Sequence, residues 1–146
     1  MPELSDVEGY KRYFNRHAGG RRIERVDVVD PAMLRGGSVR GLAGEVLGHA
    51  RRHGKWLIAD AGSATVLMHF GMTGLLRFGS YGDRHMHDRV VFVLDRGELR
   101  FRDMRKFGGV WVVRDQRGVL ELSEQVRQVI QDKVYENLVK RRHAFA

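Results

Sequence analysis

The middle of this sequence is a series of short apolar segments separated by glycine-containing turns. The interruptions include His53-Gly54, Ala61-Gly62 and Arg96-Gly97. Short apolar runs between such turns are typical of antiparallel strands, because glycine adopts the backbone angles that a tight reversal needs. The pattern predicts a mainly β fold, an antiparallel sandwich or barrel, with residues 33–44 as a loop containing one helical turn. The expected strands cover residues 23–29, 45–52, 56–60, 64–70, 75–78, 89–94, 99–103 and 110–113.

A helix is expected before the first strand. The apolar residues of segment 5–17 recur at helical spacing, and Gly19-Gly20 ends the pattern. Ser5 and Glu8 have the form of a capping box at the start of this helix. Such a helix would hold the residues just before its first turn in place. The residues at helical spacing are Val7, Tyr10, Phe14 and His17.

A second helix is expected in residues 119–146, as an extension that follows a domain of residues 1–118. Its apolar positions fall on one helical face, and Ser123 can cap its start. A basic run at residues 140–142 suits a helix C-terminus. We expect this amphipathic helix to pack on the sheet or on something missing from this chain. The apolar residues are Val126, Val129, Ile130, Val134 and Leu138.

Charge and cysteine content limit the possible functions of this 146-residue chain, which is long enough for one domain with its own core. It has 26 Lys and Arg against 18 Asp and Glu, a formal charge of +8. This charge predicts a polyanionic partner, nucleic acid ahead of a membrane. The lack of cysteine excludes disulfides, cysteine-ligated zinc and cysteine nucleophiles. With no membrane-length apolar run and no signal peptide, we expect a soluble, cytoplasmic, nucleoid-associated protein.

The first residues offer nucleophilic chemistry. Removal of Met1 would give Pro2 a free secondary amine, and an α-amino group titrates near about 8, well below a lysine. Such an amine can attack a carbon with aldehyde character, such as C1′ of a damaged nucleoside. Glu3, directly beside it, could exchange a proton with the opening sugar. The alternative is that Pro2 merely follows Met1 and that Glu3 is an acid favoured near a helix N-terminus.

Further candidates lie in turns and at strand ends. Lys55 begins a strand and is either a solvated charge or a second amine that moves protons if it lies near Pro2. Met72 lies between glycines in a tight connection, where it protrudes or fills the core. Arg105 and Phe107 follow a strand and precede two glycines. Exposed together, Met72, Arg105 and Phe107 would form a wedge that enters a duplex and fills the hole left by an extruded nucleotide.

The segment His85-Met86-His87-Asp88 has two interpretations. Its histidines could bind a metal, since alternate residues of a strand share a face, or they could contact phosphate. No third ligand is identifiable in the sequence, so we assign no metal site.

These motifs, in this order, resemble the formamidopyrimidine-DNA glycosylase and endonuclease VIII family. The resemblance implies a catalytic N-terminal domain with a two-sheet antiparallel β-sandwich and flanking helices. It also implies Pro2 as a Schiff-base nucleophile, Glu3 and Lys55 as proton donors, and a set of DNA-binding residues, which are Met72, His87, Arg105 and Phe107. It covers about residues 1–113 and rests on Pro2-Glu3-Leu4…Val7-Glu8, Gly54-Lys55-Trp56-Leu57, His69-Phe70-Gly71-Met72-Thr73-Gly74, His87-Asp88 and Asp103-Met104-Arg105-Lys106-Phe107-Gly108.

The family resemblance also shows departures. Ser5 and Asp6 replace the family's usual proline and glutamate, and Met86 and Met104 replace its frequent lysine and proline. The family's helix-two-turn-helix domain and cysteine zinc finger are expected to be absent, because residues 114–146 offer one helix and no cysteine. Half of the DNA-binding cleft would then be missing from this chain, which is either an isolated domain or a naturally short relative.

Two functional hypotheses follow from these features. The first is a DNA glycosylase and abasic-site lyase that acts at Pro2 on double-stranded DNA with an oxidised base or abasic site, by β-elimination and without a soluble cofactor. The second is a catalytically impaired DNA-binding module that keeps only the N-terminal domain. Covalent adduct formation on abasic DNA would distinguish the two.

Overall fold

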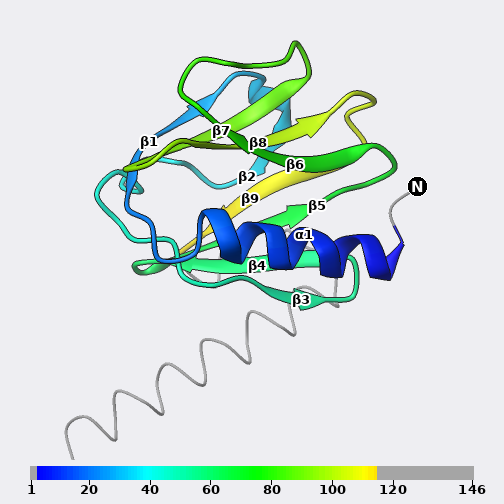
Figure 1. Ribbon diagram of the computed structural model, residues 1–146, viewed down its shortest axis with the longest axis horizontal. Coiled ribbons are helices and arrows are strands. Elements are labelled where there is room, and N and C mark those ends of the chain that lie inside the picture. The colour runs from blue at the N-terminus through cyan, green and yellow to red at the C-terminus, as the bar shows by residue number, and fades with distance from the viewer. Residues whose placement is uncertain (1–2, 115–146) are drawn as a thin grey trace, which may run out of the picture.

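Two β-sheets packed face to face form the body of the protein (Figure 1), in a computed structural model that describes residues 3–114. The two-sheet, mainly β class expected from the sequence is confirmed. All strand pairs are antiparallel except β2 with β9, which run parallel. The four-stranded sheet has the order β1 (Ile23–Val28), β7 (Asp88–Leu94), β8 (Glu98–Asp103), β6 (Gly74–Gly79). The five-stranded sheet has the order β2 (Leu34–Gly36), β9 (Gly109–Val113), β5 (Ala64–His69), β4 (Trp56–Ala61), β3 (Arg51–His53).

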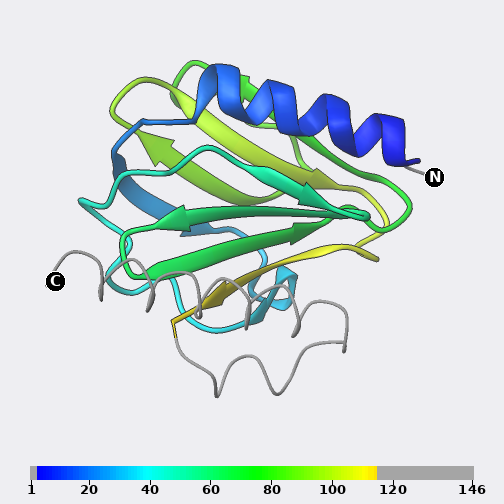
Figure 2. The same ribbon diagram turned by 90° about the horizontal axis from the view of Figure 1, so that it is seen from below.

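The helix α1 (Leu4–His17) packs along the side of the sandwich next to β6, β3 and β4 (Figures 1 and 2). Asn15 fixes it to the segment before β3. The Asn15 side chain donates to the Ala50 carbonyl at 3.1 Å and accepts the Ala50 N–H at 2.6 Å. Glu8 adds an ion pair with Arg52 of β3 at 2.9 Å. The helix is thereby held beside the β3–β4 hairpin.

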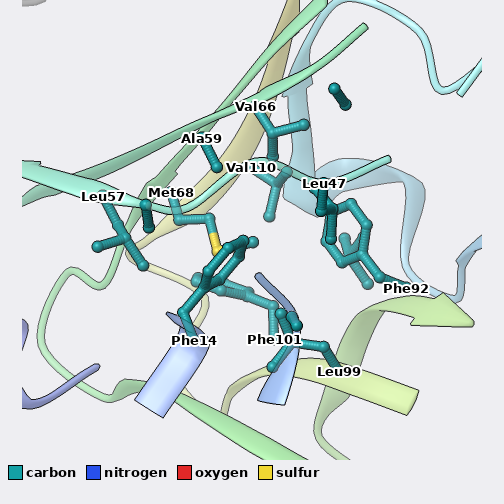
Figure 3. Packing of buried hydrophobic residues seen from close by; sticks show 14 of the residues in the cluster. Phe14, Leu47, Leu57, Ala59, Val66, Met68, Phe92, Leu99, Phe101 and Val110 are labelled. Carbon is teal, nitrogen blue, oxygen red and sulfur yellow. The ribbon is translucent and has the colours of Figure 1, made fainter. Parts of the chain in front are cut away.

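One continuous apolar core fills the space between the two sheets and α1 (Figure 3). Phe14 of α1 shares this core with Phe92 and Phe101 from the four-stranded sheet and with Leu57 and Met68 from the five-stranded sheet. Alternate residues of each strand point to opposite faces, so every second residue of β4 and β5 enters this core. The burial of these side chains from water is the main favourable term that holds the two sheets together.

The helix begins one residue earlier than the sequence pattern predicted, and its cap is different. Glu3 is the N-cap residue, and Asp6 completes a capping box by accepting the Glu3 N–H at 2.8 Å. The predicted box of Ser5 and Glu8 is wrong, because the Glu8 carboxylate is instead held by Lys11 and Arg52. Glu3 nevertheless lies just before the first turn, as the sequence predicted.

Residues 45–52 do not form the continuous strand that their sequence predicted. Only the end of this segment contributes to β3, while Val46 and Leu47 form isolated bridges to Arg22 and Ala61. One bridge lies next to the start of β1 and the other at the end of β4, so the two bridges belong to different sheets. The segment therefore crosses between the sheets and divides its hydrogen bonds between them.

The region expected to be a loop, residues 33–44, contains the strand β2 after the short helix η1 (Pro31–Met33). The parallel pairing of β2 with β9 is a feature that a series of hairpins does not predict. Pro2, the boundary at residue 118 and the expected helix in residues 119–146 lie outside the described residues. Between residues 3 and 114, no helix is long and apolar enough to span a membrane.

Candidate active site and nucleic-acid interface

Four parts of the chain meet at one end of the sandwich (Figures 1 and 2): the start of α1, the β3–β4 turn, the β5–β6 loop and the β8–β9 loop. The first two carry Glu3 and Lys55, the third carries Met72, and the fourth carries Arg105 and Phe107. The fold thus collects at one end five residues that the sequence marks as candidates but that are widely separated along the chain.

A buried aspartate joins the last two of these loops. Asp103 is the final residue of β8 and is fully buried. Its carboxylate accepts the Thr73 hydroxyl of the β5–β6 loop at 2.6 Å and the backbone N–H groups of Lys106 and Gly108 at 3.1 and 2.9 Å. The Thr73 hydroxyl oxygen in turn accepts the Arg105 N–H at 3.0 Å. The two loops therefore form one hydrogen-bonded unit.

Two glycines allow the loops to approach this closely. A Cβ atom on Gly71, whose φ is +55°, would lie 2.6 Å from the backbone nitrogen of Gly108. A Cβ atom on Gly108 would lie 2.2 Å from the carbonyl oxygen of His69. Side chains at either position would separate the loops, so glycine is needed at both for steric reasons. Lys106 also adopts a left-handed φ of +62°, which makes the tight reversal of the β8–β9 loop.

The joined loops project apolar and cationic side chains into solvent. Phe107 and Met104 are each 56 % exposed and Met72 is 39 % exposed. The Arg105 guanidinium lies over the Phe107 ring, 5.0 Å from its centre, in a cation–π arrangement. Large apolar side chains at such exposure are costly unless they meet a partner. Met72, Arg105 and Phe107, the three residues expected to form a wedge, thus lie on the two joined loops, with Met72 and Phe107 exposed.

Further side chains support the β8–β9 loop from behind. Arg35 Nε donates to the Gly108 carbonyl at 2.8 Å, and Arg89 Nε donates to the carbonyl of the last β8 residue at 3.0 Å. Lys106 Nζ pairs with Asp30 at 2.6 Å, and this hydrogen bond is the main reason why the pKa of the Asp30 carboxyl lies below its ordinary value. These contacts fix the backbone of the loop while leaving its tip free.

The supporting residues Asp103, Thr73 and Arg35 are not among the candidates that the sequence provides. A usable signal existed for Asp103, because an aspartate that ends a strand just before a loop closed by glycines is well placed to accept the N–H groups of that loop. Thr73 and Arg35 carry no such local signal, since each acts on backbone or side-chain groups far away in the sequence.

His87 lies beside this unit, at the start of β7. Its carbonyl accepts the Asp103 N–H at 3.1 Å, and its own N–H is donated to His85 Nδ1 at 3.1 Å. The following residue, Asp88, is buried and paired with Arg102 at 2.6 Å. Across residues 3–114, no group of three or more histidine, aspartate or glutamate side chains is arranged to hold a metal ion. His87 therefore lies beside the β8–β9 loop and is joined to its first residues through the backbone of Asp103.

Lys55 lies near a partly buried histidine. His69 pairs with Trp56 across β4 and β5, directly next to Lys55, and its Nδ1 accepts the Gly71 N–H at 3.1 Å. Burial, and secondly the charge of Lys55, lower the pKa of the His69 imidazole below its ordinary value. His69 thereby links the β3–β4 turn to the β5–β6 loop that carries the exposed methionine. His69 belongs to one of the sequence motifs above but was not predicted as a site residue.

Solved structures share this fold. The formamidopyrimidine-DNA glycosylase of Lactococcus lactis, non-covalently bound to DNA containing an AP site, matches with a TM-score of 0.73 and 27% identity, over 77% of this chain and 45% of that chain. MutM in complex with DNA containing carbocyclic 8-oxo-G matches with a TM-score of 0.73 and 28% identity, over 77% and 44% of the two chains. The fold of this chain is thus shared with part of these DNA glycosylase structures.

The family model for the formamidopyrimidine-DNA glycosylase N-terminal domain matches residues 1–110, and the chain belongs to this family. The formamidopyrimidine-DNA glycosylase of Paraburkholderia phytofirmans is 36% identical over 133 residues, which covers 83% of this chain and 47% of the relative. That of Burkholderia multivorans is 42% identical over 118 residues, covering 75% and 42%. This chain spans less than half the length of these relatives.

Replacing Asp103 tests whether its carboxylate holds the β5–β6 and β8–β9 loops together. Asp103→Ala should lower the free energy of unfolding by about 3 kcal/mol, because it leaves two backbone N–H groups and a hydroxyl without their acceptor. Urea denaturation measures the change. Asp95→Ala, in the exposed turn at the opposite end of β8, is the matched control and should change stability by less than about 0.5 kcal/mol. Equal stability of the two variants would show that the carboxylate does not hold the loops.

The position of Lys55 can be checked through His69. Lys55→Gln should raise the pKa of His69 toward its ordinary 6.5, without reaching it, because burial is the larger cause of the lowering. Proton NMR of the imidazole measures this pKa, with Lys11→Gln on α1 as the matched control. Because the folded-state pKa lies below the unfolded value, His69 favours folding above pH 6.5, and this contribution is lost as the pH falls. An unchanged pKa of His69 in Lys55→Gln would show that the Lys55 charge does not lie close to His69.

Proposed function

We propose that this domain excises oxidised bases from double-stranded DNA and then cleaves the strand at the abasic site, using the amine of Pro2. Membership of the formamidopyrimidine-DNA glycosylase family supports this function. The observation that carries it is the meeting of Glu3, Lys55 and the exposed loops at one end of the sandwich. A proton donor, an amine and a duplex-entering surface are the parts that such a reaction requires close together.

In the proposed reaction the Pro2 nitrogen, freed by removal of Met1, attacks C1′ of the damaged nucleotide and the bond from C1′ to the base breaks. The Glu3 carboxyl gives a proton to the ring oxygen of the sugar as the ring opens, and a Schiff base joins the protein to C1′. Transfer of a proton from C2′ to water then breaks the bond from C3′ to the 3′ phosphate by β-elimination, and Lys55, as the proton donor of this step, protonates the departing phosphate oxygen. Water finally releases the cleaved strand.

The wedge supplies access to the damaged nucleotide. A nucleotide extruded from a duplex leaves a gap in the base stack that costs a few kcal/mol. The exposed side chains of Met72 and Phe107 are apolar and can fill such a gap, while Arg105, stacked on Phe107, can hydrogen-bond the widowed base or a phosphate. His87 at the edge of the same surface adds a phosphate contact.

A second candidate function is a DNA-binding module without useful turnover. The observation that favours it is the exposed surface of the joined loops, where Arg105 lies over Phe107 and can contact DNA without any reaction at Pro2. Phosphate contacts give most of the affinity in protein–DNA complexes, so such a surface can bind a duplex without a competent nucleophile.

A trapping experiment separates the two functions. Incubation with an abasic-site duplex and borohydride should give a covalent protein–DNA adduct that is greatly reduced in Pro2→Gly. Arg96→Ala, at the far end of the sandwich, is a control that should form as much adduct as the parent. Mass spectrometry of the intact protein establishes first that Met1 has been removed. Absence of any adduct at high protein concentration, with Met1 removed and duplex bound, would contradict the enzyme and leave the binding module.

A second prediction concerns the contribution of Arg105 to the affinity for duplex DNA. Arg105→Ala should weaken duplex binding and reduce the dependence of log K on log salt by about one unit, if Arg105 neutralises one phosphate. Fluorescence anisotropy at several salt concentrations measures both quantities. Arg96→Ala removes the same charge from the opposite end and should leave affinity nearly unchanged. Equal salt slopes for Arg105→Ala and the parent would exclude a phosphate contact by Arg105.

A further inference from the structure

The side chain of His69 binds the backbone of the loop that follows its own strand. His69 is the last residue of β5, and its Nδ1 atom accepts the Gly71 N–H at 3.1 Å. Gly71 directly precedes Met72, the exposed methionine of the β5–β6 loop. One hydrogen bond therefore joins the imidazole to the backbone just before this methionine.

The β5–β6 loop is held on both sides of Met72. After Met72, the Thr73 hydroxyl is bound by Asp103 at 2.6 Å. Before Met72, the contact is that of Gly71 with His69. Gly71 cannot be fixed by a side chain of its own, because its φ is +55° and a Cβ atom there would lie 2.6 Å from the backbone of the β8–β9 loop. The first of the two holding points of Met72 is thus supplied by a neighbouring imidazole.

The His69 ring is itself packed in place. Its centre lies 4.8 Å from that of the Trp56 ring, and Trp56 is its register partner on β4. Trp56 in turn lies against Trp111 of β9, with 4.9 Å between the ring centres. Packing against neighbouring rings limits the rotation of an imidazole, so the Nδ1 atom stays directed at the Gly71 N–H.

The contact with Gly71 also defines the proton positions on His69. A protonated ring nitrogen donates and cannot accept an N–H, so Nδ1 is without a proton and the neutral imidazole carries its proton on Nε2. Burial, and secondly the charge of Lys55 from the β3–β4 turn, lower the pKa of His69. Its ring neighbour Trp56 is uncharged. The surroundings of His69 therefore keep Nδ1 free to accept at neutral pH.

We propose that His69 is a positioning residue for Met72, which acts by accepting the Gly71 N–H through Nδ1. The proposal rests on the proposed function, in which Met72 enters the gap left by an extruded nucleotide. A loop that is ordered before binding loses less entropy when it meets its partner. Because His69 packs on Trp56, the residue after Lys55, the proposed proton donor and the methionine are positioned from the same imidazole.

Two substitutions separate the acceptor from the ring. His69→Asn removes the ring but keeps an acceptor on Cγ, where Nδ1 is attached, whereas His69→Phe keeps a ring and removes the acceptor. In fluorescence anisotropy, binding to an abasic-site duplex should be about fivefold weaker in His69→Phe, the effect of one lost hydrogen bond, and within about twofold of the parent in His69→Asn. The matched control is His17→Phe, which should bind like the parent, because His17 is a partly buried histidine stacked on Phe78 at the last position of α1.

The free protein gives a test that involves neither DNA nor Pro2. In ¹³C-methyl-methionine protein, the methyl order parameter of Met72 should fall in His69→Phe and equal that of the parent in His69→Asn, because only the acceptor holds the loop. The buried Met33 should be unchanged in both variants. In the parent, the order of Met72 should also fall as His69 is protonated, with a midpoint below pH 6.5, because protonated Nδ1 releases the Gly71 N–H.

Circular dichroism and thermal unfolding establish that each variant keeps its fold, and the pH titration of the parent decides the matter if His69→Phe unfolds. Parent-like methyl order or parent-like affinity in folded His69→Phe would overturn the proposal. Equal losses in His69→Asn and His69→Phe would also overturn it, because the ring and not the acceptor would then be responsible. Loss of Met72 order in His69→Phe alone, together with no borohydride adduct in the parent, would support the positioning and contradict the proposed enzyme.

Discussion

The carboxylate of Asp103 is the constraint on which the functional end of this fold depends. The chain passes between the two sheets twice at this end, from β5 to β6 and from β8 to β9, and the buried Asp103 holds both passages. Burying a charged group without hydrogen bonds is costly, so the two loops must close around it together. This closure sets Thr73 against the β8–β9 backbone and leaves Met72 and Phe107 to project outward.

The charged side chains at this end fall into two groups, those that stabilise the loop and those that are available to DNA. Cations that stabilise the loop are satisfied inside the protein, as Lys106 is by Asp30 and Arg35 by the loop carbonyls. Arg105 has no such carboxylate partner among the described residues and stacks on Phe107 instead, so its charge is available to a polyanion. The helix that begins after the N-cap residue is anchored independently, through the side chain of Asn15 and the ion pair of Glu8.

Hairpin signals in the sequence predicted most of the strands and the mainly β class, because a glycine turn and its flanking apolar runs form a local pattern. The cap of α1 was missed because two overlapping local patterns compete: Ser5 with Glu8 and Glu3 with Asp6 have the same spacing, and Glu8 is instead held by Lys11 and Arg52. The other failures involve long-range contacts. Among the site residues, exposed loop positions such as Met72 stand out in sequence. Asp103 does not, because its partner Thr73 lies 30 residues away.

The most direct test of this account uses the methionine methyl groups as probes of where a duplex binds. Met72 and Met104 are exposed on the joined loops, whereas Met33 and Met68 are buried and serve as internal controls. Titration of ¹³C-methyl-methionine protein with an abasic-site duplex should shift or broaden the signals of Met72 and Met104 and leave those of Met33 and Met68 in place. Binding of the duplex with no change at Met72 and Met104 would contradict the account.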